Sequence, residues 1–207
     1  LVPEYCEHCH GPKYALIKSH FTLRQEQVRR RDGSVKRVLI YFGGGLDGVK
    51  STTIAVQAFL DPSLVDIQLD IVIGSIDESH APLQQMVATR GNATIYQRLP
   101  DLVELIEITD LAIGAGGTTT WERLFMGLPS IIISVADNQL PACRALASSK
   151  LVQYLGHIND VDSEMIRDCV LTCLNKPKTI RDLSKKGMDL IDGKGVKRVI
   201  ERVRTIS

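Results

Sequence analysis

The chain has 207 residues, of which 44% are hydrophobic and 24% charged, and its formal net charge is +1. These proportions are typical of a globular domain, and the near-neutral charge gives no reason to expect nucleic acid or an anionic membrane as a partner. No apolar run reaches the ~20 residues of a membrane span, and the N-terminus has no signal-like pattern. We therefore expect a cytoplasmic protein with no membrane span. Because the sequence does not begin with Met, we expect a piece of a longer protein.

A cluster of cysteines and histidines opens the chain. Cys6, Cys9 and either His8 or His10 form half of a zinc-binding pattern, and the same spacing matches a haem attachment motif. No second cysteine pair follows at the spacing of a zinc finger, and haem attachment requires export. We therefore predict no metal and no cofactor, with a partial zinc site at Cys6 and Cys9 as the alternative.

Three consecutive arginines at residues 29–31 precede an Asp-Gly turn. We expect this basic run to be a solvated linker, or to face a second domain. On this basis we divide the chain into an inter-domain segment and linker at residues 1–34 and a regular domain at residues 35–207.

From residue 35 onward, short apolar runs rich in β-branched residues alternate with helix-like segments. This alternation predicts βαβ units and an α/β, Rossmann-like, doubly wound parallel sheet. Runs that are apolar at nearly every position are typical of strands buried on both faces. The predicted strands are residues 35–42, 67–73, 93–96, 111–113, 130–135 and 151–155. The predicted helices are residues 50–60, 79–89, 101–108, 118–126, 139–149, 162–174, 178–190 and 195–204.

Ligands of such sheets bind at the carboxyl ends of the strands. The glycine-rich loop at residues 43–48 follows the first predicted strand, and glycine permits both a positive φ and close approach of backbone N–H groups to an anion. Gly44 and Gly45 are the candidate nucleotide-binding residues here. The loop is neither a Walker A sequence nor a full G-x-G-x-x-G, so a tight turn without a ligand is the alternative.

A second glycine-rich loop, at residues 114–120, follows the fourth predicted strand and opens a helix. Its small residues clear space, and its threonines add hydroxyl donors beside the helix N-terminus. We predict that Gly116, Gly117 and Thr118 bind a diphosphate. Glu122 lies just inside the helix, where its carboxylate either accepts hydrogen bonds from the vicinal hydroxyls of a ribose or favours the helix start.

Two polar amides, Asn138 and Gln139, follow the fifth predicted strand. They are either turn formers or ligand contacts. Since the carboxyl ends of parallel strands meet at one edge, we expect the three polar clusters to converge on one crevice. Asn138 and Gln139 would then face the sugar and the β-phosphate of a nucleotide sugar, and topology alone assigns the base to residues 97–99.

Several of these stretches carry a family resemblance over roughly residues 11–160. The most specific part closely resembles the C-terminal half of the UDP-sugar hydrolases of pseudaminic acid biosynthesis and of the related spore-coat polysaccharide biosynthesis proteins. The residues concerned are 114–123 (GAGGTTTWER), 127–130 (GLPS) and 137–139 (DNQ). Supporting matches are residues 11–16 (GPKYAL), similar to the inter-domain segment of that family, and residues 44–47 with Thr52, similar to its first glycine loop.

The resemblance implies the C-terminal half of a GT-B arrangement, in which two Rossmann-like domains enclose a UDP-sugar. In that family the C-terminal domain holds UDP, and a His of the N-terminal domain helps water to attack the anomeric carbon without a metal. The implied function is therefore the UDP-binding domain, at residues 35–207, of a hydrolase that cleaves a UDP-deoxy-diacetamido sugar in surface polysaccharide or nonulosonic acid biosynthesis. The catalytic residues would lie in an N-terminal domain that this sequence lacks. The alternatives are a UDP-sugar-dependent GT-B glycosyltransferase and a non-catalytic nucleotide-sugar-binding module.

The first glycine loop departs from the family pattern. Leu46, Gly48 and Lys50 stand where the family usually has Ser, Pro and Asn. Leu46 lacks the hydroxyl donor of Ser, so the sugar or phosphate contact of this loop differs from that of the family. A different sugar, or a paralogue with another role, fits these changes.

Overall fold

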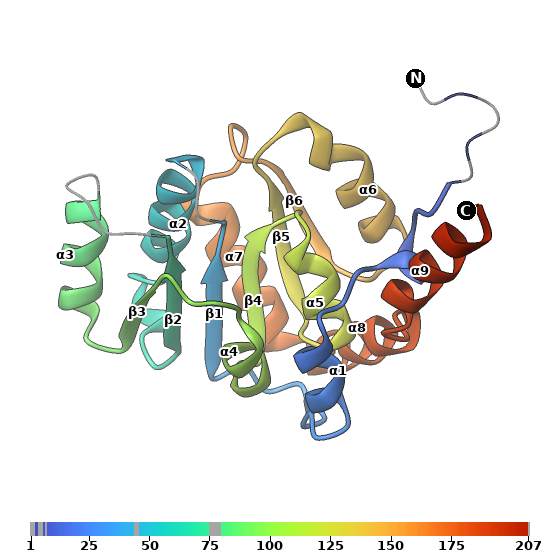
Figure 1. Cartoon of the computed structure of the whole chain (residues 1–207). Coiled ribbons are helices and arrows are strands. Elements are labelled where there is room, and N and C mark those ends of the chain that lie inside the picture. The colour runs from blue at the N-terminus through green and yellow to red at the C-terminus, as the bar shows by residue number, and fades with distance from the viewer. Residues whose placement is uncertain (1–2, 4–5, 7, 44–45, 75–79, 207) are drawn as a thin grey trace.

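A computed structural model describes residues 3, 6, 8–43, 46–74 and 80–206, without the side chains of residues 46, 47, 205 and 206. Within these residues, six strands form one parallel sheet in the order β3-β2-β1-β4-β5-β6 (Figure 1). This is the strand order of a Rossmann fold, so the predicted doubly wound α/β class is confirmed. The strands are β1 (Arg37–Tyr41), β2 (Gln68–Ile73), β3 (Ala93–Gln97), β4 (Leu111–Ala115), β5 (Ser130–Ser134) and β6 (Gln153–His157).

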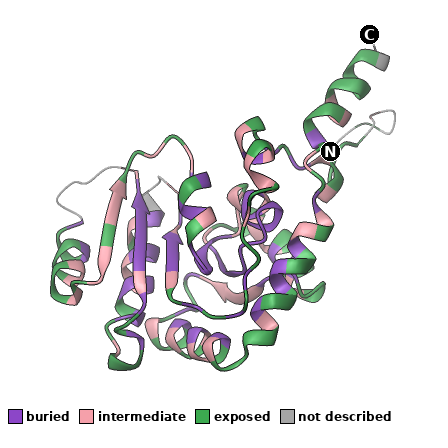
Figure 2. Ribbon diagram, turned by 90° about the horizontal axis from the view of Figure 1, so that it is seen from below, coloured by how far each residue is buried: buried purple, intermediate pink, exposed green. Residues whose placement is uncertain are grey.

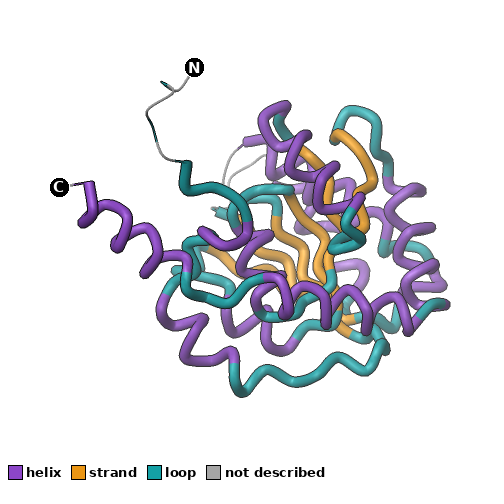
Figure 3. Tube along the Cα trace, turned by 90° about the vertical axis from the view of Figure 1, so that its right-hand side faces the viewer, coloured by secondary structure: helices purple, strands orange, loops and turns teal. Residues whose placement is uncertain are grey.

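Helices cover both faces of the sheet (Figures 1 and 3). They are α1 (Ser19–Gln25), α2 (Leu46–Ala58), α3 (Ala81–Arg90), α4 (Val103–Ile108), α5 (Thr119–Phe125), α6 (Leu140–Ser148), α7 (Ser163–Asn175), α8 (Pro177–Leu190) and α9 (Gly195–Ile206). Successive side chains of a strand point to opposite faces. Val38 and Ile40 accordingly pack in one core with α2, α3 and α7, whereas Leu39 packs in a second core with α1, α4, α5 and α6.

Burial differs between central and edge strands (Figure 2). Every residue of β4 and β5 is buried, as expected for strands covered on both faces. The edge strands β3 and β6 are only partly buried. The most apolar predicted strands are thus the central ones.

The predicted strands all exist, but the boundaries of the last one were wrong. The prediction placed it at residues 151–155, and β6 begins only at Gln153. Leu151 and Val152 are buried in the turn after α6, so their apolar character reflects packing of that turn. No helix of the described part is long and apolar enough to cross a membrane.

The segment before the sheet packs against it. Phe21 of α1 is fully buried, and Ile17 is buried just before that helix. The expectation that the whole basic run at residues 29–31 is solvated is wrong for Arg31, which is 5% exposed. Its guanidinium donates to four backbone carbonyls where α4 and α5 end, those of Ile106, Thr109, Met126 and Gly127. The last carbonyls of a helix lack intrahelical donors, which gives Arg31 this buried position.

Candidate functional site

From β1 the strand order runs through β2 and β3 to one edge of the sheet, and from β4 it runs through β5 and β6 to the other edge. The order therefore reverses between the neighbouring strands β1 and β4. In doubly wound sheets ligands bind outside the carboxyl ends of the strands at this switch point. Residues 116–118 join β4 to α5 here, and residues 135–139 join β5 to α6. The first glycine loop after β1 cannot be compared, because Gly44 and Gly45 lie outside the described residues.

The glycines at the end of β4 and in the loop after it differ in why glycine is present. A Cβ at Gly114 would clash with the Tyr41 carbonyl of β1, and one at Gly116 would clash with Cys143 Sγ of α6. A Cβ at Gly117 would meet nothing closer than 4.0 Å, where Gln139 Nε2 lies. Packing therefore requires glycine at Gly114 and Gly116, whereas the space beside Gly117 is open.

Two of the three predicted clusters lie together. Gln139 is close to the Gly116–Gly117 turn, and its Oε1 accepts a hydrogen bond from the Val135 amide at 3.0 Å. Asn138 is exposed in the short 3-10 helix at Asp137–Gln139, and Thr118 is exposed at the start of α5, where its side chain makes no capping hydrogen bond. This edge thus presents an amide and a hydroxyl to solvent.

Glu122 lines a small pocket of about 140 Å³ at the carboxyl ends of β1, β2 and β3. Thr119 of the same helix contributes to it, as do Arg98 and Leu99 from the loop after β3. The structure therefore brings Glu122 to the loop at residues 97–99, to which topology alone assigned the base. Arg98 has a φ of +49°, a left-handed conformation that is uncommon for residues other than glycine and that clusters at ligand sites.

Lys18, just before α1, also lines this pocket, and its Nζ lies 3.8 Å from Glu122 Oε1. The Glu122 side chain is only 10% exposed, and burial raises the pKa of its carboxyl, while the charge of Lys18 opposes that shift. The site thus holds a buried carboxylate whose one ion pair in the described chain is with a half-exposed lysine, while His20 and Arg123 act on it from further away. Sequence reasoning missed Lys18, although it follows the 11–16 segment by two residues.

A neighbouring hollow of about 300 Å³ shares Leu99 and Asp101 with the Glu122 pocket. His20 of α1 borders it, with Nε2 3.1 Å from Asp101 Oδ2 in an alignment too poor for a hydrogen bond. The two hollows thus lie next to each other beside the loop after β3.

Arg123 lies beneath the loop after β4 and is 3% exposed. Its guanidinium donates to the Ala115 carbonyl at 2.8 Å and to Thr120 Oγ1 at 2.9 Å, while Nε has no partner. Burial lowers the pKa of Arg123 to about 10, so the group is still a cation at neutral pH. The charge of Glu122 opposes that lowering, but no carboxylate of the described chain lies within 4 Å of the guanidinium. The motif at 114–123 contains Arg123, but the sequence alone suggested no role for it.

Within the described residues, no three His, Cys, Asp or Glu side chains come together as metal ligands. Cys6 is half-buried and Cys9 is exposed. The absence of a metal there stays a prediction.

No protein-family model matches the chain. Over 192 residues it is 24% identical to the spore coat polysaccharide biosynthesis protein SpsG of Bacillus subtilis, an alignment that covers 91% of this chain and 56% of SpsG. The chain is homologous to SpsG. The predicted resemblance to the spore-coat polysaccharide proteins is thereby confirmed. The uncharacterized protein MJ1062 of Methanocaldococcus jannaschii is 26% identical over 129 residues, or 60% of this chain and 26% of MJ1062. The chain therefore spans only about a quarter to just over half of these relatives.

Solved structures support the fold. MurG of Acinetobacter baumannii superposes with a TM-score of 0.67 at 16% identity, over 89% of this chain and 52% of MurG. The UDP-GlcNAc 2-epimerase of Neisseria meningitidis, solved with UDP-GlcNAc bound, gives 0.66 at 14% identity, over 90% of this chain and 50% of the epimerase. The chain thus has the Rossmann-like fold of one half of a GT-B arrangement.

Proposed function

We propose that this chain is the UDP-binding half of a nucleotide-sugar hydrolase that cleaves a UDP-deoxy-diacetamido sugar at its anomeric carbon. The homology to SpsG supports a role in polysaccharide biosynthesis. The structures of the epimerase bound to UDP-GlcNAc and of Staphylococcus aureus MnaA bound to UDP support a UDP-sugar as the ligand. In this proposal the catalytic residues belong to a second domain.

The observation that carries the proposal is the pocket of Glu122. A carboxylate accepts two hydrogen bonds, and the vicinal hydroxyls of a ribose offer two donors. The raised pKa of Glu122 reflects partial desolvation, which strengthens charge-assisted hydrogen bonds to a ligand. Arg98 and Leu99 line the same pocket, and we propose that backbone groups of the loop at residues 97–99 contact the base.

The diphosphate would lie between the two loops after β4 and β5. Gly117 leaves open space there, Thr118 offers a hydroxyl, and Gln139 approaches from the second loop. Arg123 beneath the loop adds a buried positive charge that interacts with the charge of Glu122 but forms no ion pair within 4 Å in the described chain. In this reading the diphosphate is the counter-ion of Arg123, and Asn138 faces the sugar.

A glycosyltransferase of the same architecture is the second candidate, because MurG and the lipopolysaccharide glycosyltransferase WaaG have similar folds. The two functions differ in the acceptor of the sugar, which is water for the hydrolase and a hydroxyl compound for the glycosyltransferase. A second domain would supply that side of the reaction.

We place the second domain against α9, which extends away from the sheet (Figures 1 and 3). Val196, Ile200 and Val203 recur along this helix and are 41%, 45% and 59% exposed. Val196 and Ile200 also line a hollow of about 650 Å³ between α9 and α1. Such an exposed apolar stripe at helical spacing is typical of an interface.

Calorimetric titration of the chain with UDP, uridine and NAD tests the proposed ligand. We expect UDP to bind more tightly than uridine, because the diphosphate adds contacts, and NAD to bind more weakly than UDP. Tighter binding of NAD would contradict the proposal. A coupled assay for UDP released from a UDP-diacetamido-trideoxyhexose should show no turnover by this chain alone.

A further inference from the structure

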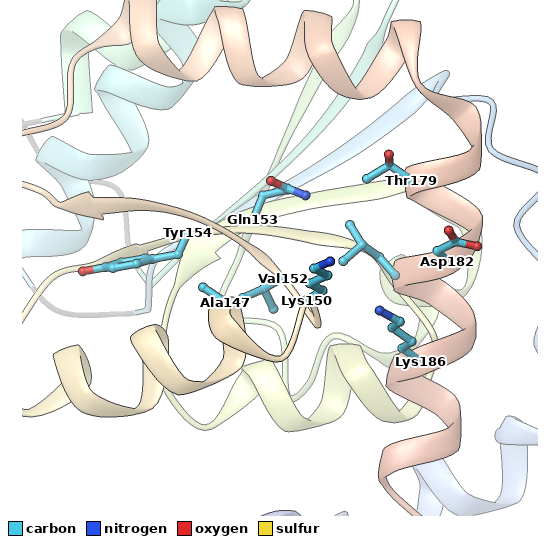
Figure 4. A pocket seen from close by; sticks show the side chains of 9 residues that line it. Ala147, Lys150, Val152, Gln153, Tyr154, Thr179, Asp182 and Lys186 are labelled. Atoms are coloured by element: carbon cyan, nitrogen blue, oxygen red, sulfur yellow. The ribbon is translucent and has the colours of Figure 1, made fainter.

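A further hollow, of about 450 Å³, opens away from the candidate nucleotide site (Figure 4). It lies between the turn after α6, the beginning of β6 and one face of α8. Gln153, the first residue of β6, forms part of it, so the hollow is at the amino end of this parallel strand. The crevice of Glu122 is at the carboxyl ends of strands, and one ligand cannot occupy both.

Two ammonium groups from different elements line this hollow. Lys150 comes from the turn after α6 and Lys186 from α8 (Figure 4). Neither makes an ion pair in the part of the chain that the structure describes. Asp182, one turn before Lys186, is the one carboxylate lining the hollow, so its lining carries a net positive charge.

The backbone of Lys150 is in an unfavourable conformation. Its φ is +54°, and its amide donates to the Ala147 carbonyl while the Leu151 amide donates to Leu146, which is the pattern of a Schellman motif. Glycine is the usual residue at this left-handed position, since a Cβ is disfavoured there. Only Arg98 shares a positive φ among the described non-glycine residues, and it too lines a pocket. The turn itself would favour glycine at this position. We therefore infer that a lysine is present because its ammonium group has a role.

We propose that this hollow binds the phosphate monoester of a sugar, with Lys150 and Lys186 holding the phosphate. Two ammonium groups match a phosphate dianion. The amide of Gln153, the hydroxyl of Thr179 and the carboxylate of Asp182 are hydrogen-bonding groups suited to sugar hydroxyls. Val152 and Leu183 form an apolar floor for the C–H face of a sugar ring. The volume lies within the usual range of small-molecule sites.

Calorimetric titration with glucose 1-phosphate, inorganic phosphate and glucose tests the site. We expect glucose 1-phosphate to bind more tightly than phosphate, and glucose not to bind detectably. Lys150→Gly and Lys186→Gln should each weaken glucose 1-phosphate binding about five- to tenfold. Lys185→Gln is the matched control, because Lys185 is exposed on α8 outside the hollow, and it should leave the affinity unchanged.

Three outcomes would overturn the proposed site, and a fourth would overturn its sugar part. A wild-type chain that does not bind glucose 1-phosphate excludes the site, and equal affinities in the wild type and both lysine variants would place the ligand elsewhere, including the nucleotide crevice. Equal weakening by Lys185→Gln would indicate general attraction by charge. If phosphate binds as tightly as glucose 1-phosphate, the sugar part of the proposal is wrong.

Lys150→Gly also tests whether the left-handed backbone conformation of Lys150 lowers stability. Lys150→Gly should raise the melting temperature by about 2–4 °C while it weakens binding, because glycine fits the left-handed position. A lower melting temperature would contradict the claim that Lys150 is kept for its ammonium group.

Discussion

Two arginines are almost completely buried in this protein, and they differ in how their donors are used. Arg31 is 5% exposed and Arg123 is 3% exposed, and burial lowers the pKa of each to about 10. Arg31 donates to four backbone carbonyls. Arg123 donates to one carbonyl and one hydroxyl, and its Nε has no partner.

The two arginines also lie at opposite ends of the sheet. Arg31 binds the carbonyls just before β4 and β5, at their amino ends, whereas Arg123 binds the Ala115 carbonyl at the carboxyl end of β4. A buried cation whose donors are satisfied by the fold stabilises that fold. One with spare capacity beside an open loop is suited to an anionic ligand. Mutation should therefore separate a structural arginine from a ligand-binding one.

Arg31→Met should have the largest effect, on stability. The variant leaves four carbonyls at the ends of α4 and α5 without donors, and we expect the free energy of unfolding to fall by about 3–5 kcal/mol. Urea denaturation measures this, with Arg30→Met as the control, since Arg30 is exposed. The affinity of the folded protein for UDP should not change. A loss of stability no larger than that of the control would show that water replaces Arg31 easily.

Glu122→Gln should have the next largest effect, on binding. The substitution keeps the size and one acceptor but removes the charge, and we expect UDP affinity to fall ten- to a hundredfold, or about 1.4–2.7 kcal/mol. Glu164→Gln is the control, because Glu164 is exposed on α7 and lines neither hollow of the site. A 2′,3′-dideoxy UDP analogue and Glu122→Gln should be non-additive if Glu122 binds the ribose. If stability falls while the UDP dissociation constant is unchanged, Glu122 only favours the helix start.

Arg123→Met should weaken UDP binding about tenfold, or about 1.4 kcal/mol, and leave uridine binding unchanged, because only UDP carries the diphosphate. Arg123→Lys keeps the charge and should retain more of the UDP affinity than Arg123→Met. The free energy of unfolding should fall less than in Arg31→Met, because fewer acceptors lose a donor. Equal losses of UDP and uridine affinity would show that Arg123 only supports the loop. If the unmutated chain binds neither ligand, the proposed function itself is wrong.

Much of the fold was predictable because strands buried on both faces are apolar at nearly every position. The segment before the sheet was not, because its local sequence is polar and basic. Arg31 is buried only because two helix ends distant in sequence expose carbonyls to it. Periodicity in one segment carries no information about such a partner.

The candidate site was predictable to a different degree in each loop. Glu122 and Gln139 lie at the carboxyl edge of the sheet, as the order of strands predicts. Their binding roles stay predictions. Lys18 and Arg98 reach the pocket from segments whose approach depends on tertiary packing. Gly116 looked like a phosphate-binding glycine, but its contact with Cys143 gives it a packing reason that sequence could not reveal.

The smallest predicted effect is a pH dependence of Glu122 with opposite signs for stability and binding. Because burial raises the pKa of this carboxyl, the folded state binds its proton more tightly than the unfolded state. The wild type should therefore lose stability relative to Glu122→Gln as the pH rises from 4.5 through the raised pKa.

Uridine affinity should change the other way, because a ribose needs the ionised carboxylate as acceptor. Uridine is the suitable ligand, since it lacks the phosphates that titrate themselves. It should bind the wild type more tightly as the pH rises through the same range, and Glu122→Gln should show no such rise. Lys18, Asp101, His20 and Arg123 also act on Glu122, but both proteins contain them, so the difference between the two profiles isolates Glu122. The opposite result for stability would be a wild type that gains stability relative to Glu122→Gln as the pH rises. The ionised carboxylate would then be satisfied by groups of the fold, as Arg31 is, and would not be held for a ligand.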